Sequence, residues 1–98
     1  MSVKETKLEI AGFLKKNHRD SLWMMTTYIN LYNFLIIFHD EKGFRKLYIK
    51  IKPSPTGRLT SAQEKFRTEN SRNTSLYLVV FSFKDFLCNY EHFKKGVY

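Results

Sequence analysis

Four kinds of residue are scarce in this 98-residue chain, which has one cysteine, two prolines, four glycines and nine acidic residues. A single cysteine, Cys88, excludes an internal disulfide and any cysteine-based zinc site. No apolar run approaches the length of a membrane span, and residues 1–7 are too polar for a signal peptide. We therefore expect a soluble protein in the cytoplasm of a bacterial or other host cell, with Cys88 as a small core residue on a helix.

Basic and aromatic residues are abundant by contrast. Seventeen lysines and arginines give a net charge of +8, and 43% of the residues are hydrophobic, with 16% aromatic. This composition predicts one folded domain over residues 1–98 with a core rich in Phe and Tyr. The charge favours an acidic partner, of which nucleic acid is the commonest, with a membrane surface or an acidic protein as the others. The three histidines are far apart and show no ligand spacing, so we expect no metal site among them.

The spacing of apolar residues predicts seven elements in the order α-β-β-β-α-β-α. The expected helices are residues 3–17, 62–71 and 83–94, and the expected strands are residues 21–30, 33–39, 45–52 and 75–81. A turn at residues 40–43, with Gly43 at positive φ, predicts an antiparallel hairpin, and the last β-α-β unit implies a parallel pair. The nearly continuous apolar strands 33–39 and 75–81 are typical of the sheet interior. The predicted class is an α/β fold with a mixed sheet.

Helical spacing also predicts which residues the outer helices bury. The first helix carries Val3, Leu8, Ala11 and Leu14 on one face, with Ile10 and Phe13 to one side. The last helix carries an apolar stripe at i, i+3, i+4, i+7 and i+10 that begins at Phe83 and ends at Phe93. The first helix is therefore expected to be amphipathic, and the stripe of the last helix is expected to belong to the core.

The stretch from residue 47 to residue 66 reads as strand, turn and helix. The alternating run Leu-Tyr-Ile-Lys-Ile-Lys ends at Pro53, which cannot donate a hydrogen bond to a neighbouring strand. Two overlapping capping boxes follow, one from Thr60 to Gln63 and one from Ser61 to Glu64. Either box starts a helix near Ala62.

This stretch resembles the virus-type replication-repair nuclease family (VRR-NUC), a branch of the PD-(D/E)xK nucleases. That family shows an apolar strand with Glu-x-Lys, a short Pro/Gly loop, then Gly-Arg-Leu-Ser/Thr-x-x-Gln and a helix. The corresponding residues here are Lys50-Ile51-Lys52 and Gly57-Arg58-Leu59-Thr60-Ser61-Ala62-Gln63. The resemblance implies a restriction-endonuclease-like core and, for an intact site, phosphodiester hydrolysis with Mg²⁺ or Mn²⁺.

The sequence departs from the family at both acidic positions. Lys50 replaces the glutamate of Glu-x-Lys, and the family's aspartate aligns with Asn33. Lys52 and Gln63 match, and the family's first-helix glutamate corresponds to Glu5 or Glu9. A pocket that holds Lys50 and Lys52 without the two carboxylates repels a divalent cation. The resemblance therefore implies a degenerate catalytic site at Asn33, Lys50, Lys52 and Gln63, with no metal and no other cofactor.

We expect the remaining charges to bind phosphate. Lys50, Lys52 and Arg58 form what we call the cationic notch, beside the start of a helix whose N–H groups favour anions. Lys15, Lys16 and Arg19 form a second basic patch. The simpler interpretations are a solvated strand face for the two notch lysines, a capping residue for Gln63, a strand-entry residue for Asn33 and a solvated helix end for the second patch.

Two other classes of function remain open at this stage. One is an active nuclease whose metal ligands are Glu9 with Asp40 or Glu41. The other is an inhibitor or decoy that keeps the fold and binds a protein such as a host defence complex, since the resemblance includes small stand-alone phage proteins. The resemblance also implies a homodimer.

Overall fold

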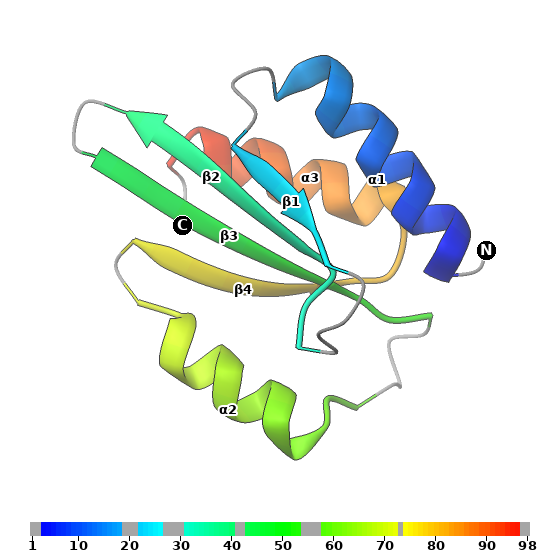
Figure 1. Ribbon diagram of the computed structural model, residues 1–98, viewed down its shortest axis with the longest axis vertical. Coiled ribbons are helices and arrows are strands. Elements are labelled where there is room, and N and C mark those ends of the chain that lie inside the picture. The colour runs from blue at the N-terminus through cyan, green and yellow to red at the C-terminus, as the bar shows by residue number, and fades with distance from the viewer. Residues whose placement is uncertain are drawn as a thin grey trace.

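A four-stranded mixed sheet in the order β1-β2-β3-β4 runs through the computed structural model (Figure 1), which describes residues 3–18, 22–26, 31–40, 43–53, 58–72 and 74–96. β3 lies between an antiparallel neighbour, β2, and a parallel neighbour, β4. The elements in chain order are α1 (Val3–Asn17), β1 (Trp23–Met25), β2 (Phe34–Asp40), β3 (Gly43–Ile51), α2 (Ser61–Asn70), β4 (Ser75–Val80) and α3 (Phe83–Lys94).

The helices cover both faces of the sheet. In Figure 1, α1 and α3 lie on one side of the strands and α2 lies on the other. The larger core cluster joins α1 and α3 to inward-facing residues of β2 and β3 such as Phe34, Ile36, Leu47 and Ile49. A smaller aromatic cluster lies on the α2 side, where the Phe66 ring packs against three buried tyrosines, namely Tyr32, Tyr48 and Tyr77. The chain therefore forms a mixed α+β fold with three layers.

β3 divides its side chains between these two layers, because successive residues of a strand point to opposite faces. Leu47, Ile49 and Ile51 belong to the larger core, while Tyr48 belongs to the aromatic cluster. Lys50 alternates with Ile49 and Ile51 and so shares the α2 face with Tyr48. This alternation places a lysine on the buried part of the sheet.

The element boundaries agree closely with the sequence expectation. The predicted helix 83–94 and its stripe are confirmed, with Phe86, Tyr90 and Phe93 buried. Gly43 closes the β2–β3 hairpin at φ 119°. Of the predicted strand 21–30, Trp23–Met25 form β1, while residues 22 and 26 lie outside the strand and residues 21 and 27–30 lie outside the described part.

Three placements predicted from the sequence are wrong. β4 lies at the sheet edge rather than in the interior, because its apolarity reflects the helices that cover its faces and not a strand on each side. Leu8 is 63% exposed, whereas Ile10 is fully buried, so the buried stripe of α1 is rotated from the predicted one. Cys88 is exposed on α3 because it lies outside the Phe86–Tyr90–Phe93 stripe.

Candidate nucleic-acid interface

The start of α2 is fixed by a capping box between Thr60 and Gln63. The Thr60 hydroxyl accepts from the Gln63 N–H at 3.2 Å, and the Gln63 Oε1 accepts from the Thr60 N–H at 2.9 Å. The Gln63 side chain is 1% exposed. Of the two capping boxes that the sequence allowed, the structure contains the one from Thr60 to Gln63. Gln63 therefore acts as a capping residue, which was the simpler of its two interpretations.

Asn33 lies beside the end of β3. Its backbone N–H donates to the Ile49 carbonyl at 2.7 Å, and its Oδ1 accepts from the Ile51 N–H, also at 2.7 Å. Its carbonyl accepts from the Thr26 N–H at 2.9 Å. Asn33 thus continues the β2–β3 pairing past Phe34, because its backbone N–H binds the residue before Lys50 and its side chain binds the residue after it.

Lys50 is nearly buried, with 7% of its surface exposed. Burial lowers the pKa of its ammonium group below the usual 10.5, and repulsion from Lys52 and then from Lys7 lowers this pKa further. The charges of Lys52 and Lys7 therefore lie close enough to Lys50 to oppose its protonation. The cationic notch is more crowded with positive charge than the sequence indicated.

Lys7 is the residue that the sequence interpretation missed. The family resemblance pointed to Glu5 or Glu9 on the first helix, but both are exposed, whereas Lys7 is half-buried and its Nζ donates to the Thr26 carbonyl at 3.3 Å. A signal was present, because Lys7 lies three and seven residues before the buried Ile10 and Leu14 and so shares their helix face. A lysine on the buried face of an otherwise apolar stripe marks a residue directed toward the sheet.

Arg58 lines a cavity of about 340 Å³ between the start of α2 and the end of β4. The other lining residues that the structure describes are Leu59, Glu64, Arg67, Val79 and Phe81. We call this cavity the β4 groove. It adjoins the cationic notch, since the Lys52 N–H donates at 3.0 Å to the carbonyl of Val80, between Val79 and Phe81.

The second basic patch is separate from the notch. Lys15 and Lys16 are exposed in the last turn of α1, while Lys7 lies near the opposite end of that helix, about 13 Å away along its axis. Arg19 lies outside the described residues. The same is true of Glu41 and of the Asp40 side chain, so the structure does not test the relocated-carboxylate alternative.

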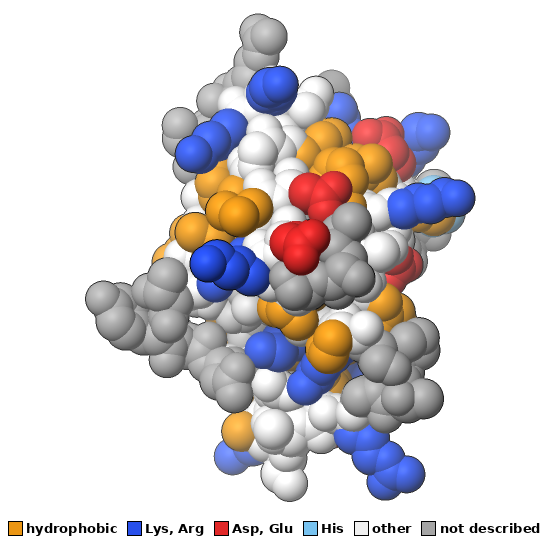
Figure 2. Space-filling model, turned by 90° about the vertical axis from the view of Figure 1, so that its right-hand side faces the viewer, with side chains coloured by type: hydrophobic (Ala, Val, Ile, Leu, Met, Phe, Trp, Pro, Cys, Tyr) orange, Lys and Arg blue, Asp and Glu red, His pale blue; other side chains and the backbone are white. Residues whose placement is uncertain are grey.

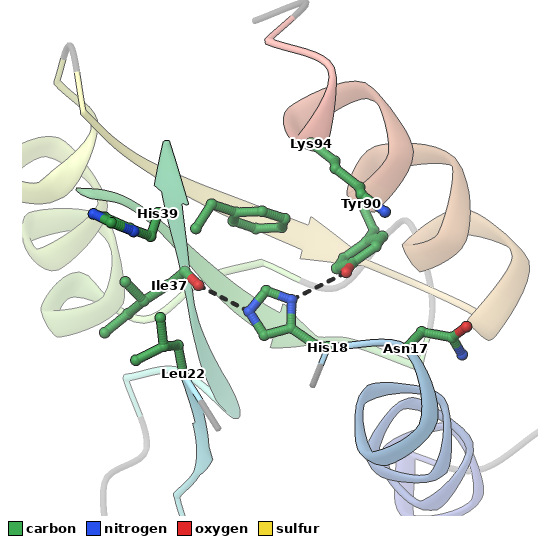
Figure 3. Close-up of a pocket in the computed structure, with 8 residues that line it drawn as sticks. Asn17, His18, Leu22, Ile37, His39, Tyr90 and Lys94 are labelled. Carbon is green, nitrogen blue, oxygen red and sulfur yellow. Dashed lines mark hydrogen bonds between the residues drawn. The ribbon is translucent and has the colours of Figure 1, made fainter. Parts of the chain in front are cut away.

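The opposite end of the sheet holds a different cavity, of about 190 Å³, around His18 (Figure 3). The His18 Nε2 lies 2.8 Å from the Ile37 carbonyl, and its Nδ1 lies 3.0 Å from the Tyr90 hydroxyl. A carbonyl only accepts, so Nε2 donates to Ile37, while Nδ1 shares the second hydrogen bond with the Tyr90 hydroxyl. Both ring nitrogens are therefore used to join α1, β2 and α3, which makes His18 a structural junction.

The end of the molecule that carries the notch has an uneven distribution of charge. Figure 2 looks onto the right-hand side of Figure 1, where the last residues of β3 and β4 and the beginnings of α1 and α2 lie. In the lower part of that view, toward α2, lysine and arginine side chains are visible and no described acidic side chain is. The acidic side chains of this face lie in its upper part.

Comparisons with protein-family models, with curated proteins and with solved structures find no match to this chain. Among the described residues, no three His, Cys, Asp or Glu side chains are grouped so that they could hold a metal ion. None of the described helices is both long and apolar enough to cross a membrane. The likeness to the VRR-NUC family therefore rests on the motif between residues 48 and 66.

Proposed function

We propose that this chain is a catalytically degenerate PD-(D/E)xK nuclease-like protein that binds the phosphate backbone of nucleic acid without cleaving it. The observation that carries the proposal is the placement of Lys50, which is nearly buried on the α2 face of β3 where the positive charges of Lys52 and Lys7 both lower its pKa. Holding like charges together costs free energy, and a phosphate between them would offset that cost. The site is thus suited to an anion in the way that the intact family site is suited to a dication.

The arrangement of neighbouring groups supports the same ligand. In the adjoining β4 groove, Arg58 supplies a guanidinium that can bind a phosphate through two N–H groups, and the start of α2 beside that groove adds the positive end of a helix dipole. The basic lower part of the face in Figure 2 would attract a polyanion over a longer range than a single phosphate. A nucleic-acid strand is the polyanion that this charge distribution fits best.

The first arm of the test measures binding. Fluorescence anisotropy with a labelled DNA oligonucleotide should show an affinity that falls steeply as salt rises, because binding releases counterions. Lys7→Gln and Lys52→Gln should each weaken binding several-fold and reduce the slope of log K against log salt by about one. Lys84→Gln, an exposed lysine on α3, is the matched control and should change neither value. Absence of binding at low salt, or equal losses in all three variants, would contradict the proposal.

The second arm measures cleavage of plasmid and single-stranded DNA with Mg²⁺ and Mn²⁺. We expect no metal-dependent activity in the natural chain, because Lys50 opposes a dication where the family has a glutamate. The double variant Asn33→Asp with Lys50→Glu restores the family's two carboxylates and should gain activity if the ancestry is correct. Robust metal-dependent cleavage by the natural chain that disappears in Lys52→Ala would overturn the proposal and favour an active nuclease with relocated ligands.

A further inference from the structure

The β4 groove has a composition that a phosphate site alone does not require. Three of its described lining residues are apolar, namely Leu59, Val79 and Phe81, and two carry guanidinium groups, namely Arg58 and Arg67. Arg67 is held by Glu64, with its Nη2 2.6 Å from the carboxylate. The groove therefore combines an apolar wall and an aromatic ring with two exposed guanidinium groups, of which that of Arg67 is paired with Glu64.

We propose that the β4 groove accepts an unpaired nucleobase, so that the ligand of the cationic notch is a single-stranded rather than a fully paired nucleic acid. This inference rests on the proposed function, because it assigns the strand's backbone to the notch and its base to the groove. A planar base presents faces that stack on Phe81 or on a guanidinium, and every base has such a face. A base paired within a duplex has its faces covered by its neighbours.

The relation between the groove and the notch makes one strand able to reach both. Val79 lies opposite Lys50 in the β3–β4 register, and the Lys52 N–H donates to the carbonyl of the next residue, Val80. Arg58, which the sequence grouped with the two notch lysines, lines the groove. The notch residues on β3 and the groove residues on β4 thus lie on adjacent strands. A phosphate at the notch and the base of the same or the next nucleotide at the groove would therefore be neighbours.

The volume of the β4 groove agrees with this occupant. At about 340 Å³ it falls in the lower part of the range of small-molecule sites, which is roughly 300–1,000 Å³. One base fits such a volume, whereas a base pair with both of its backbones does not. The net charge of its ionisable lining residues, two arginines and one glutamate, is positive and suits a ligand attached to phosphate.

The test compares three labelled ligands of equal length: a thymidine oligonucleotide, an abasic oligonucleotide with the same phosphates and no bases, and a duplex. The natural chain should bind the thymidine strand about tenfold more tightly than the abasic strand, which is the size of one stacked base. In Phe81→Leu the ratio of these two affinities should fall close to one. The matched control is Phe44→Leu, which alters a 57% exposed ring at the start of β3 and should keep the ratio.

A photocrosslink keeps the inference testable if Phe81→Leu folds poorly, which its thermal melt would reveal. A 5-iodouracil strand bound to the natural chain should crosslink within the peptide that contains Phe81. Crosslinks confined to other peptides, or equal affinity for the thymidine and abasic strands, would overturn the base site and leave the backbone proposal standing. Failure of all three ligands to bind at low salt would overturn the proposed function itself.

Discussion

Lys50 shows how one residue can be placed correctly from sequence while its environment is not. The alternation Leu47-Tyr48-Ile49-Lys50 predicted its face, because a strand has a strict two-residue period. The same pattern favoured a solvated lysine as the simpler interpretation, whereas the side chain is nearly buried. Its burial comes from packing in three dimensions, and Lys7, which is 43 positions away in the chain, adds to the charge around it.

Lys50 should destabilise the free protein at neutral pH. Its folded pKa lies below the unfolded value, so folding penalises the charged form. Lys50→Met keeps the length of the side chain and removes the charge, and it should raise the free energy of unfolding at pH 7 by about 1 kcal/mol. Urea titration measures the change, with Lys46→Met, an exposed position on the same strand, as the control.

The pH dependence of the same two proteins gives an independent check. Between the lowered folded pKa of Lys50 and the unfolded value of 10.5, the unfolded chain binds more protons, so stability contributed by this group rises with pH. Lys50→Met should lack that rise. Burial raises the pKa of Tyr77 to about 12, and this group acts in the opposite sense above pH 10, so the comparison belongs below that pH. A parallel pH profile for both proteins would contradict the assignment.

At the scale of elements, α2 demonstrates what local sequence signals determine. Hydrogen bonds between Thr60 and Gln63 are local, so the capping box is readable from four residues. The edge position of β4 is not local. Two helices bury the faces of β4, and an apolar run reports burial without reporting whether a neighbouring strand or a helix causes it.

Removal of the hydroxyl at Thr60 should destabilise the protein, whereas removal of the neighbouring hydroxyl at Ser61 should not. Thr60→Ala deletes the hydroxyl that accepts from the Gln63 N–H and should lower the free energy of unfolding by about 1 kcal/mol. Ser61→Ala removes the hydroxyl on which the alternative box would depend, and it should change the value by less than about 0.5 kcal/mol. Chemical denaturation of both variants distinguishes the two boxes. A larger loss in Ser61→Ala would show that the second box forms in solution.

At the scale of the whole molecule, the net charge of +8 predicted an acidic partner but not where it binds. The fold separates the basic residues into a notch at one end of the sheet and a patch at the far end of α1, because α1 is a rigid rod that holds Lys7 and Lys16 apart. From the sequence, both the cationic notch and the second basic patch were predicted to bind phosphate. The distance between Lys7 and Lys16 follows from helix geometry, but the position of Lys7 near Lys50 depends on tertiary packing and could not be inferred from the sequence.

The junction at His18 connects three elements that are distant in the chain, so its loss should lower the stability of the whole fold. Burial and the nearby Glu91 raise the pKa of Tyr90, so its hydroxyl stays protonated where it hydrogen-bonds to His18. Tyr90→Phe removes that hydroxyl and should lower the free energy of unfolding by about 1 kcal/mol. The m-value of urea unfolding should not change. Cys88→Ala, an exposed change on the same helix, is the control, and an equal effect of the two variants would contradict the junction.

β3 is hydrogen-bonded along both of its edges and covered by helices on both faces. A strand held in this way cannot slide or tilt without breaking two ladders at once, so the backbone that carries Lys50 is ordered before any ligand arrives. Little conformational entropy is then lost there on association, and the free energy of attraction is not spent on ordering the backbone. Binding of an anion at the end of β3 would therefore require little conformational change of the backbone.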